Sequence, residues 1–285
     1  MCIRDRPTTF DELIRISGLS HGTDVWLGNA QSLIEEGTVT LNEAICCRDD
    51  IMIYLIKKGV PPNHAFKIME TVRKGKALKD PAKWAEYVAM MKENKVPEWY
   101  IKSCEKIKYM FPKAHAAAYV TNAFRIAWFK VHEPKAYYTA FFTIRADEFD
   151  SDVMCYGKEK VKNKMKEIDL QGNAATTKDK NMYAILELVL EMYERGINFL
   201  PIDLYKSHST KFQIEDEGIR PPLNSVPGLG TVAAQGIETA KKDGKFMSID
   251  DMKIRSKIGN SVVELLTKMG CLKGMSQSNQ MSLFG

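Results

Sequence analysis

The sequence has no arrangement of cysteine that would support a disulfide framework or a zinc ribbon. Its six cysteines are scattered over 285 residues, with no C-x-x-C pair and no zinc-knuckle spacing. Small secreted domains and zinc ribbons both depend on closely spaced cysteines. The pattern therefore excludes these two classes and indicates a protein of the reducing cytosol.

Long apolar runs and strong net charge are absent too. No stretch approaches the ~18 apolar residues of a transmembrane helix, and the first residues lack the apolar segment of a secretory signal. We therefore expect a cytoplasmic protein with no membrane partner. The net charge of +5 allows polyanion binding without requiring it. With 45% hydrophobic residues the chain can bury a core, and its length suits about two domains.

Strand patterns are scarce, whereas the signals that begin and end helices are frequent. Asn63 and Asp80 are placed as N-caps, and Pro81 stands at a first helical position. The spacing predicts helices ending at Lys58 and over residues 63–74, 80–92, 97–111 and 114–132. Strands are expected only within residues 198–223, on either side of 215–218. The predicted fold is mainly α.

The helix over residues 114–132 divides into two faces of different character. One face should be buried because it collects small and apolar side chains. Its members are Ala116, Ala117, Val120, Ala123, Phe124, Ala127, Trp128 and Val131. The opposite stripe follows Lys113 and consists of His115, Tyr119, Asn122 and Arg125. These side chains suit a ligand with phosphates, a sugar and a stackable base, and a surface helix with a mixed polar face is the alternative.

Basic residues elsewhere have two explanations each. Arg73 and two lysines surround Gly75 at a helix end, where they can meet a phosphate or favour the helix dipole. Arg48 stands before two aspartates and can bind a triphosphate or pair with them. The lysine run over residues 158–166 is explained without a ligand as a solvated helix face.

Residues 226–231 have the pattern of a helix-hairpin-helix turn. Gly228 and Gly230 let the backbone turn tightly around Leu229 and expose its N–H groups, and Thr231 can cap the next helix. Such a turn holds a DNA phosphate without reading sequence, although a plain inter-helix turn is the alternative. A more degenerate second unit follows, in which Ser248 to Asp251 look like a capping box, residues 259–260 a turn and residues 261–268 a helix. Residues 241–273 contain eight Lys or Arg against four Asp or Glu, so DNA is the leading partner.

The acidic pairs are better explained as helix ends than as a metal site. Asp150 and Asp152 precede a lysine-rich helix and are expected to form its N-cap. The pairs at 49–50 and 250–251 fit the same interpretation. We assign no catalytic residue and no metal ligand, which disfavours a self-sufficient nuclease or transferase.

The last eleven residues, 275–285, differ from the rest. They carry no charge and no helix pattern, yet they end in Gln280-Met281-Ser282-Leu283-Phe284. Burial of such apolar side chains in a partner's pocket contributes roughly 1.5–3 kcal/mol each. A tail that folds back onto its own domain is the alternative.

Together these segments resemble the C-terminal part of bacterial PolC-type DNA polymerase III alpha subunits. The start of the resemblance is ISGLSHGTDVW, residues 16–26, similar to the passage from palm to fingers. CRDDIM (47–52), VRKGK (72–76) and FPKAHAAAY (111–119) look like fingers motifs, the hairpin resembles the duplex-binding region, and QMSLF looks like the clamp-binding peptide. The likeness runs in the family's order from Arg6 to Phe284 and leaves out residues 1–5, so we expect a segment of a longer polymerase.

The resemblance implies a division of labour along the chain. Residues 1–30 would end the palm, 31–170 form helical fingers, 171–274 form a small α+β duplex-binding region with tandem hairpins, and 275–285 form a flexible clamp-binding tail. Nucleotide contacts would come from Arg48, Arg73, Lys113, His115 and Arg125, DNA contacts from Gly228, Leu229, Gly230 and Thr231, and clamp contacts from Gln280, Leu283 and Phe284.

The family joins deoxynucleoside triphosphates to a primer using two Mg²⁺ ions held by palm aspartates that lie before this segment. The resemblance thus implies four partners, namely template-primer DNA, deoxynucleoside triphosphates, the sliding clamp and the remainder of the polymerase chain. It also implies that the segment alone is inactive. The competing hypothesis is a free-standing helix-hairpin-helix DNA adaptor, which accounts for the hairpins and the tail but not for the His115 stripe.

Overall fold

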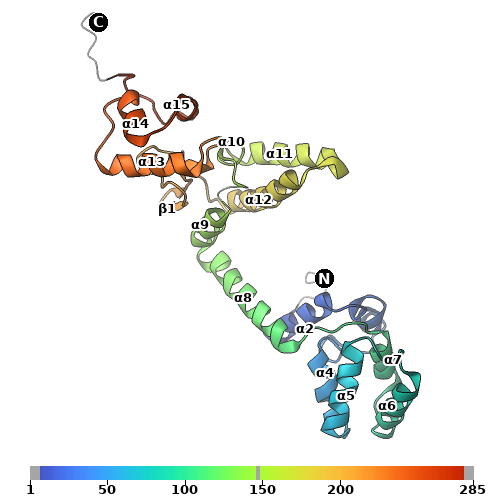
Figure 1. Cartoon of the computed structure of the whole chain (residues 1–285). Helices are drawn as coiled ribbons and strands as arrows, with labels where there is room; N and C mark the ends of the chain where they lie inside the picture. Colours follow the sequence, from blue (N-terminus) through green and yellow to red (C-terminus); the bar gives the residue numbers. More distant parts are fainter. Residues whose placement is uncertain (1–6, 146–147, 279–285) are drawn as a thin grey trace, which may run out of the picture. The chain divides into compact units, whose positions relative to one another are not determined.

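A computed structural model describes residues 7–145 and 148–278. Over those residues the fold is mainly helical with one small pair of strands, as predicted (Figure 1). The chain divides into two compact units between residues 126 and 127, within helix α8. The predicted limits of the functional regions, at residues 30, 170 and 274, are a separate division and stay predictions.

The first unit is built of short helices around one hydrophobic core. Its elements are α2 (Phe10–His21), η1 (Trp26–Ala30), α3 (Gln31–Glu35), α4 (Arg48–Lys57), α5 (Pro62–Arg73), α6 (Pro81–Glu93), α7 (Glu98–Lys106) and the start of α8 (Lys113–His132). Ile51, Leu55 and Ile68 are completely buried where α4 packs against α5. Tyr54 stacks on the buried Tyr100 of α7 at 4.2 Å between ring centroids.

The predicted helix ends are confirmed in part. At α6, the Asp80 side chain accepts a hydrogen bond from the Lys83 amide at 3.2 Å, and Pro81 is the first helical residue. Asn63 is not an N-cap, because Pro61 takes that place and Pro62 begins α5. A proline fits the first turn since its missing N–H would have no helical partner there.

Helix α7 ends at Lys106, five residues before the predicted end at Phe111. Residues 107–112 leave the helix because their backbone bonds to distant segments instead. The Thr23 amide donates to the Tyr109 carbonyl at 2.9 Å, and the Arg48 amide donates to the Phe111 carbonyl at 3.2 Å. Such long-range pairing does not appear in local helix propensity.

The second unit has two cores. Its elements are the end of α8, α9 (Pro134–Ile144), α10 (Ser151–Met154), α11 (Lys158–Gln171), η3 (Gly172–Ala174), α12 (Thr177–Glu194), β1 (Gln213–Glu215), β2 (Gly218–Arg220), η4 (Leu223–Ser225), α13 (Thr231–Lys242), α14 (Ile249–Ser256) and α15 (Asn260–Lys268). One core surrounds Phe142, whose ring contacts Phe149, Phe199 and Phe212. The other lies beneath α13–α15 and includes Leu229.

The two strands fall where they were expected. β1 and β2 pair antiparallel with Ile214 opposite Ile219, and residues 216–217 form the turn. The Arg220 side chain of β2 donates two hydrogen bonds to the Glu215 carboxylate of β1, and these bonds link the two strands. The sheet remains small because the rest of residues 198–223 is irregular chain.

The predicted burial of one face of α8 is wrong beyond its first turns. Ala116 is fully buried against Ile14 and Cys47, but Phe124 and Trp128 are 54% and 50% exposed. The boundary between the two units falls within helix α8, and only the first turns of this helix pack against hydrophobic residues of the first unit. Apolar periodicity therefore identified which face of the helix is apolar. It did not show whether another element covers that face.

Candidate nucleic-acid interface

The segment 110–113 brings three of the predicted nucleotide-binding residues together. The Met110 amide donates to the Arg73 carbonyl at 3.4 Å, and the Arg48 amide donates to the Phe111 carbonyl. The Asp49 carboxylate accepts from the Lys113 amide at 2.8 Å. The start of α4, the end of α5 and the start of α8 thus meet at this segment.

Lys113 is held by acidic neighbours. Its Nζ lies 3.2 Å from Asp11 Oδ1 and 3.8 Å from Asp50 Oδ1, and Arg15 shares both acids at 2.9 and 3.9 Å. Burial raises the pKa of Asp11, but hydrogen bonds from Arg15 and Lys113 outweigh it, and the pKa lies below its usual value. Two cations therefore face two carboxylates, and a phosphate would have to compete with the carboxylates for Lys113.

Arg48 and Arg73 differ in how far they are already engaged. The Arg48 Nε is buried and makes no hydrogen bond to the described residues, with Asp49 Oδ2 at 3.6 Å. A buried donor without a partner is unfavourable, so Arg48 is available for an acceptor. Arg73 binds both oxygens of Glu70, and this hydrogen bonding lowers the Glu70 pKa to about 2.

His115 lines a pocket of about 470 Å³ that also includes Ser17, His21, Phe111 and Tyr119. His21 stacks on Phe111 at 5.0 Å, Phe111 meets His115 edge-on at 5.3 Å, and His115 meets Tyr119 at 5.0 Å. The rings form a continuous aromatic wall suited to a planar heterocycle. Sequence reasoning missed His21 and Phe111 as wall residues, although both lie in the motifs that carried the family resemblance.

Arg125 is not brought to this pocket. It lies ten residues beyond His115 on α8, which places it about 15 Å further along the helix axis. It is exposed. Arg125 does not line the pocket around His115, and its predicted contact with the nucleotide stays a prediction.

The hairpin at residues 226–231 has the expected backbone. Gly228 adopts φ +89°, Leu229 is buried at 2% exposure, and Gly230 is extended at φ −68° and ψ 157°. Gly230 rather than Thr231 is the N-cap of α13, so the predicted capping role of Thr231 is wrong. Thr231 is already the first helical residue, and its hydroxyl accepts from Asn224 Nδ2 at 3.5 Å. The first turn of α13 thus has no side-chain cap.

The turn between α14 and α15 follows the same pattern. Lys257 adopts φ +56°, Ile258 is buried at 7% exposure, and Gly259 is extended at φ −84° and ψ 171° before α15 begins at Asn260. Ser248 caps α14 through the Asp251 amide at 3.1 Å, as predicted. Sequence reasoning placed a turn at Gly259 but missed Lys257 and Ile258, which correspond to Gly228 and Leu229.

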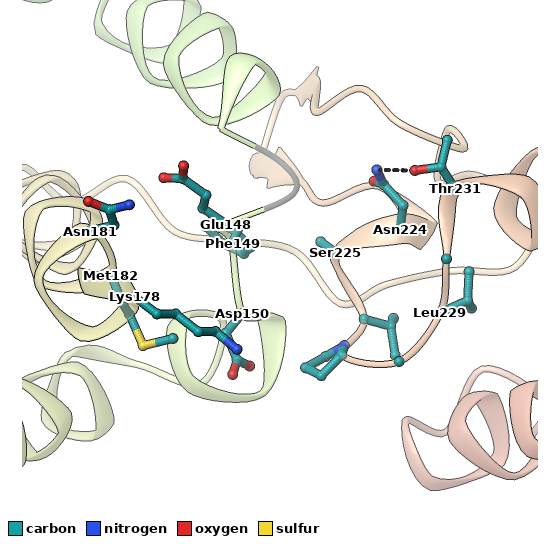
Figure 2. A pocket seen from close by; sticks show the side chains of 14 residues that line it. Glu148, Phe149, Asp150, Lys178, Asn181, Met182, Asn224, Ser225, Leu229 and Thr231 are labelled. Carbon is teal, nitrogen blue, oxygen red and sulfur yellow. Dashed lines mark hydrogen bonds between the residues drawn. The ribbon is translucent and has the colours of Figure 1, made fainter. Parts of the chain in front are cut away.

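A pocket of about 660 Å³ adjoins the first hairpin (Figure 2). The hairpin forms one side, and Lys178 and Asn181 of α12 form another. Glu148 and Asp150 lie between them. The hairpin backbone, a lysine, two amides and two carboxylates therefore surround a space large enough for a sugar-phosphate.

Two family models match separate parts of the chain. Residues 1–95 match the bacterial DNA polymerase III alpha subunit finger domain, and residues 196–282 match a helix-hairpin-helix motif. PolC-type DNA polymerase III of Clostridium perfringens is 54% identical over 285 residues, all of this chain. The enzymes of Caldanaerobacter subterraneus and Bacillus subtilis are 55% and 54% identical over 100% and 98% of it. The chain belongs to the PolC-type DNA polymerase III family.

The chain spans about a fifth of the length of these PolC-type relatives, 19–20%. The Clostridium match includes residues 1–5, which the sequence resemblance had left out. Within residues 7–145 and 148–278, no helix is both long and apolar enough to cross a membrane.

The lysine run of α11 has partners within the PolC-type segment itself. Lys158 and Lys162 lie 3.5 and 3.6 Å from Glu194, and Lys164 lies 2.7 Å from Glu167. These contacts fit the interpretation of a solvated, ion-paired face. Asp150 accepts from the Val153 amide at 3.2 Å, which confirms it as an N-cap, although of the short α10 rather than of α11.

The predicted clamp-binding residues Gln280, Leu283 and Phe284 lie outside the described residues. Of the tail, residues 275–278 are described. The Ile249 and Asp250 amides donate to the carbonyls of Ser276 and Gln277 at 2.9 and 3.1 Å. The beginning of the tail is therefore bound to the start of α14.

Proposed function

We propose that this segment binds the incoming deoxynucleoside triphosphate and the template-primer duplex for a replicative DNA polymerase, and tethers the polymerase to the sliding clamp. The observation that carries the DNA part is the same succession at residues 228–230 and 257–259 of a residue with positive φ, a buried apolar residue and an extended glycine. Each turn leads into a helix N-terminus without a side-chain cap. Two uncapped N-termini beside such turns offer N–H groups to phosphates.

The nucleotide part rests on the neighbourhood of residues 110–115. The aromatic wall around His115 suits the base. The Nε of Arg48 lies 3.6 Å from Asp49 Oδ2 but makes no hydrogen bond to the described residues, so it suits a phosphate oxygen. Lys113 would exchange its carboxylate contacts for phosphate contacts on binding. The role of these groups is to neutralise and position the triphosphate.

The metal chemistry of such a polymerase is assigned to parts outside this segment. In the part of the chain that the structure describes, no three His, Cys, Asp or Glu side chains are grouped so as to hold a metal ion. The described residues therefore do not fit a two-metal site. We propose that Mg²⁺ acts in the intact polymerase on ligands from the remainder of its chain.

The isolated 285-residue chain should give no templated primer extension with Mg²⁺ and all four deoxynucleotides. Its acidic pairs are engaged at helix ends, with Asp150 on the Val153 amide and Asp50 on the Cys47 amide. A gel-based extension assay with the pure chain measures this. Extension that depends on the template would refute the assignment and point to a site among these acids.

The tail should bind the sliding clamp independently of DNA. Changing Leu283 and Phe284 to alanine removes apolar burial of roughly 1.5–3 kcal/mol each, so clamp binding should be lost. DNA affinity and the melting temperature should stay almost unchanged. Surface plasmon resonance on immobilised clamp, with thermal melting alongside, separates the alternatives, because a fall of several degrees would mean that the tail packs on its own domain.

The free-standing DNA adaptor remains the second candidate. It shares the DNA and tail predictions but requires no nucleotide site. Titration of the chain with a fluorescent deoxynucleoside triphosphate distinguishes the two, and the His115→Ala variant is the specific control. Binding that His115→Ala weakens supports the polymerase role, whereas no binding to either protein favours the adaptor.

A further inference from the structure

The first hairpin offers hydrogen-bond donors but no charge of its own. Residues 226–231 contain no charged side chain, in contrast to the second turn, where Lys257 occupies the position of Gly228. Phosphate binding by proteins is largely an ionic interaction that releases counterions. A hairpin without a cation therefore needs a charge from another element.

Lys178 is placed to supply that charge. Among the described residues that line the 660 Å³ pocket, it alone is positively charged. Its interaction with the described residues is electrostatic, since its charge adds to the Thr176 hydrogen bonds that lower the pKa of Asp179 in the first turn of the same helix. Its helix begins at a fixed place, because Thr176 and Asp179 form a capping box in which each side chain accepts from the other's backbone amide, at 3.1 and 3.0 Å. The backbone of Lys178 is thus fixed at the start of α12, and its exposed side chain can reach into the pocket.

The two carboxylates of the pocket are engaged locally. Glu148 accepts from Arg145 at 3.2 Å, and Asp150 caps α10. Figure 2 shows the Lys178 side chain extending from α12 toward Asp150, with Asn181 on the same helix. A phosphate on the hairpin side would therefore meet one ammonium group and the amides of Asn181 and Asn224, with Asp150 as a neighbouring carboxylate.

We propose that Lys178 contacts the DNA phosphate held by the first hairpin, so that α12 forms the second side of a phosphate cradle and Asn181 adds a neutral donor. This proposal rests on the proposed DNA-binding function and names a further residue of that site. The ligand class is the sugar-phosphate backbone of duplex DNA, without base recognition.

The test compares Lys178→Ala with Lys180→Ala in the 285-residue chain. Both lysines are exposed on α12, but Lys180 lines a different groove with Ile168 and Tyr183. Lys178→Ala should weaken binding several-fold, equally for unrelated duplexes, and reduce the slope of log affinity against log salt by about 0.9. Lys180→Ala should leave both unchanged. Fluorescence anisotropy at several salt concentrations measures the slope.

A second pair of variants tests whether Lys178 merely neutralises Asp150. Asparagine is as good an N-cap as aspartate, so Asp150→Asn keeps α10 capped. If Lys178 contacts phosphate, Lys178→Ala should lose the same affinity in the Asp150→Asn background. Loss of the effect in that background would overturn the proposal, as would equal slopes for the two lysine variants. Failure of the DNA-binding function itself would differ, because the unmodified chain would then show no salt-dependent duplex binding.

Discussion

Replacing Gly230 with valine should lower the affinity of the chain for duplex DNA at least tenfold, whereas the poorer N-cap should lower its melting temperature by no more than a few degrees. Gly230 has an extended backbone that any residue adopts, at φ −68°. A Cβ built there meets no atom within 4 Å. The added side chain would therefore be tolerated by the fold, yet it would stand where a phosphate approaches the start of α13. A tenfold loss corresponds to about 1.4 kcal/mol.

Gly228 is the less informative position, even though it belongs to the same turn. Its φ of +89° strains any side chain, and a Cβ would lie 3.1 Å from Leu265 Cδ1. A loss of DNA binding in Gly228→Val would therefore mix misfolding with obstruction. Gly230→Val separates the two, provided that thermal melting is measured on the same preparation.

Gly259→Val tests the second turn in the same way. Gly259 is extended at φ −84°, and a Cβ there would be in ordinary contact with Ser261 Oγ at 4.0 Å. If both turns hold phosphates, the two single variants should each weaken binding, and their effects should add in the double variant. Affinity equal to that of the unmodified chain in both single variants would remove the hairpins from the DNA site.

Much of the fold is predictable where a side chain determines the conformation of the backbone next to it. Asp80 and Pro81 begin α6 because a carboxylate caps the turn and proline fits its first position. The hairpin at Gly228 and Gly230 is predictable for the same reason, since only glycine adopts φ +89° without strain. These features depend on a few neighbouring residues.

The wrong predictions concern features that depend on contacts with segments distant in the sequence. Helix α7 stops at Lys106 because residues 109 and 111 bond to Thr23 and Arg48, which are remote in sequence. The exposure of Phe124 on α8 likewise depends on which elements lie beside the helix. No local pattern contains either fact, so propensity and periodicity mislead at both places.

The candidate site shows the same division. His115 was predicted from its own helix stripe, but its wall is completed by His21 of α2 and by Phe111. Lys178 was not predicted at all, because its position opposite the hairpin arises from packing between residues about 50 apart. Motif spacing therefore predicts one side of a site, and tertiary structure supplies the other.

Replacing Gly75 with alanine should destabilise the first unit by about 3 kcal/mol or more, far beyond the ordinary effect of a left-handed glycine. Gly75 lies between α5 and the segment that carries the nucleotide site, at φ +61°. A Cβ there would lie 2.6 Å from the carbonyl oxygen and 2.9 Å from the Cα of Lys108. Both are backbone atoms, so neither can turn aside as a flexible side chain would.

Gly37→Ala is the matched control for the free-energy cost of placing alanine in the left-handed backbone conformation. Gly37 lies in the same unit at φ +72°, and a Cβ there meets nothing within 4 Å. Its replacement should therefore cost about 1–2 kcal/mol, the penalty of the left-handed conformation alone. The difference between the two variants isolates the clash with Lys108.

Urea unfolding followed by tryptophan fluorescence measures both variants, because three of the four tryptophans, Trp26, Trp84 and Trp99, lie in the first unit. Gly75→Ala should also weaken nucleotide binding, since any shift of Lys108 moves the chain toward Phe111 and Lys113. Equal destabilisation in Gly75→Ala and Gly37→Ala would show that this segment relaxes freely. Gly75 would then serve only as a turn at the end of α5. The close packing of residues 108–113 would not be needed to position the nucleotide site.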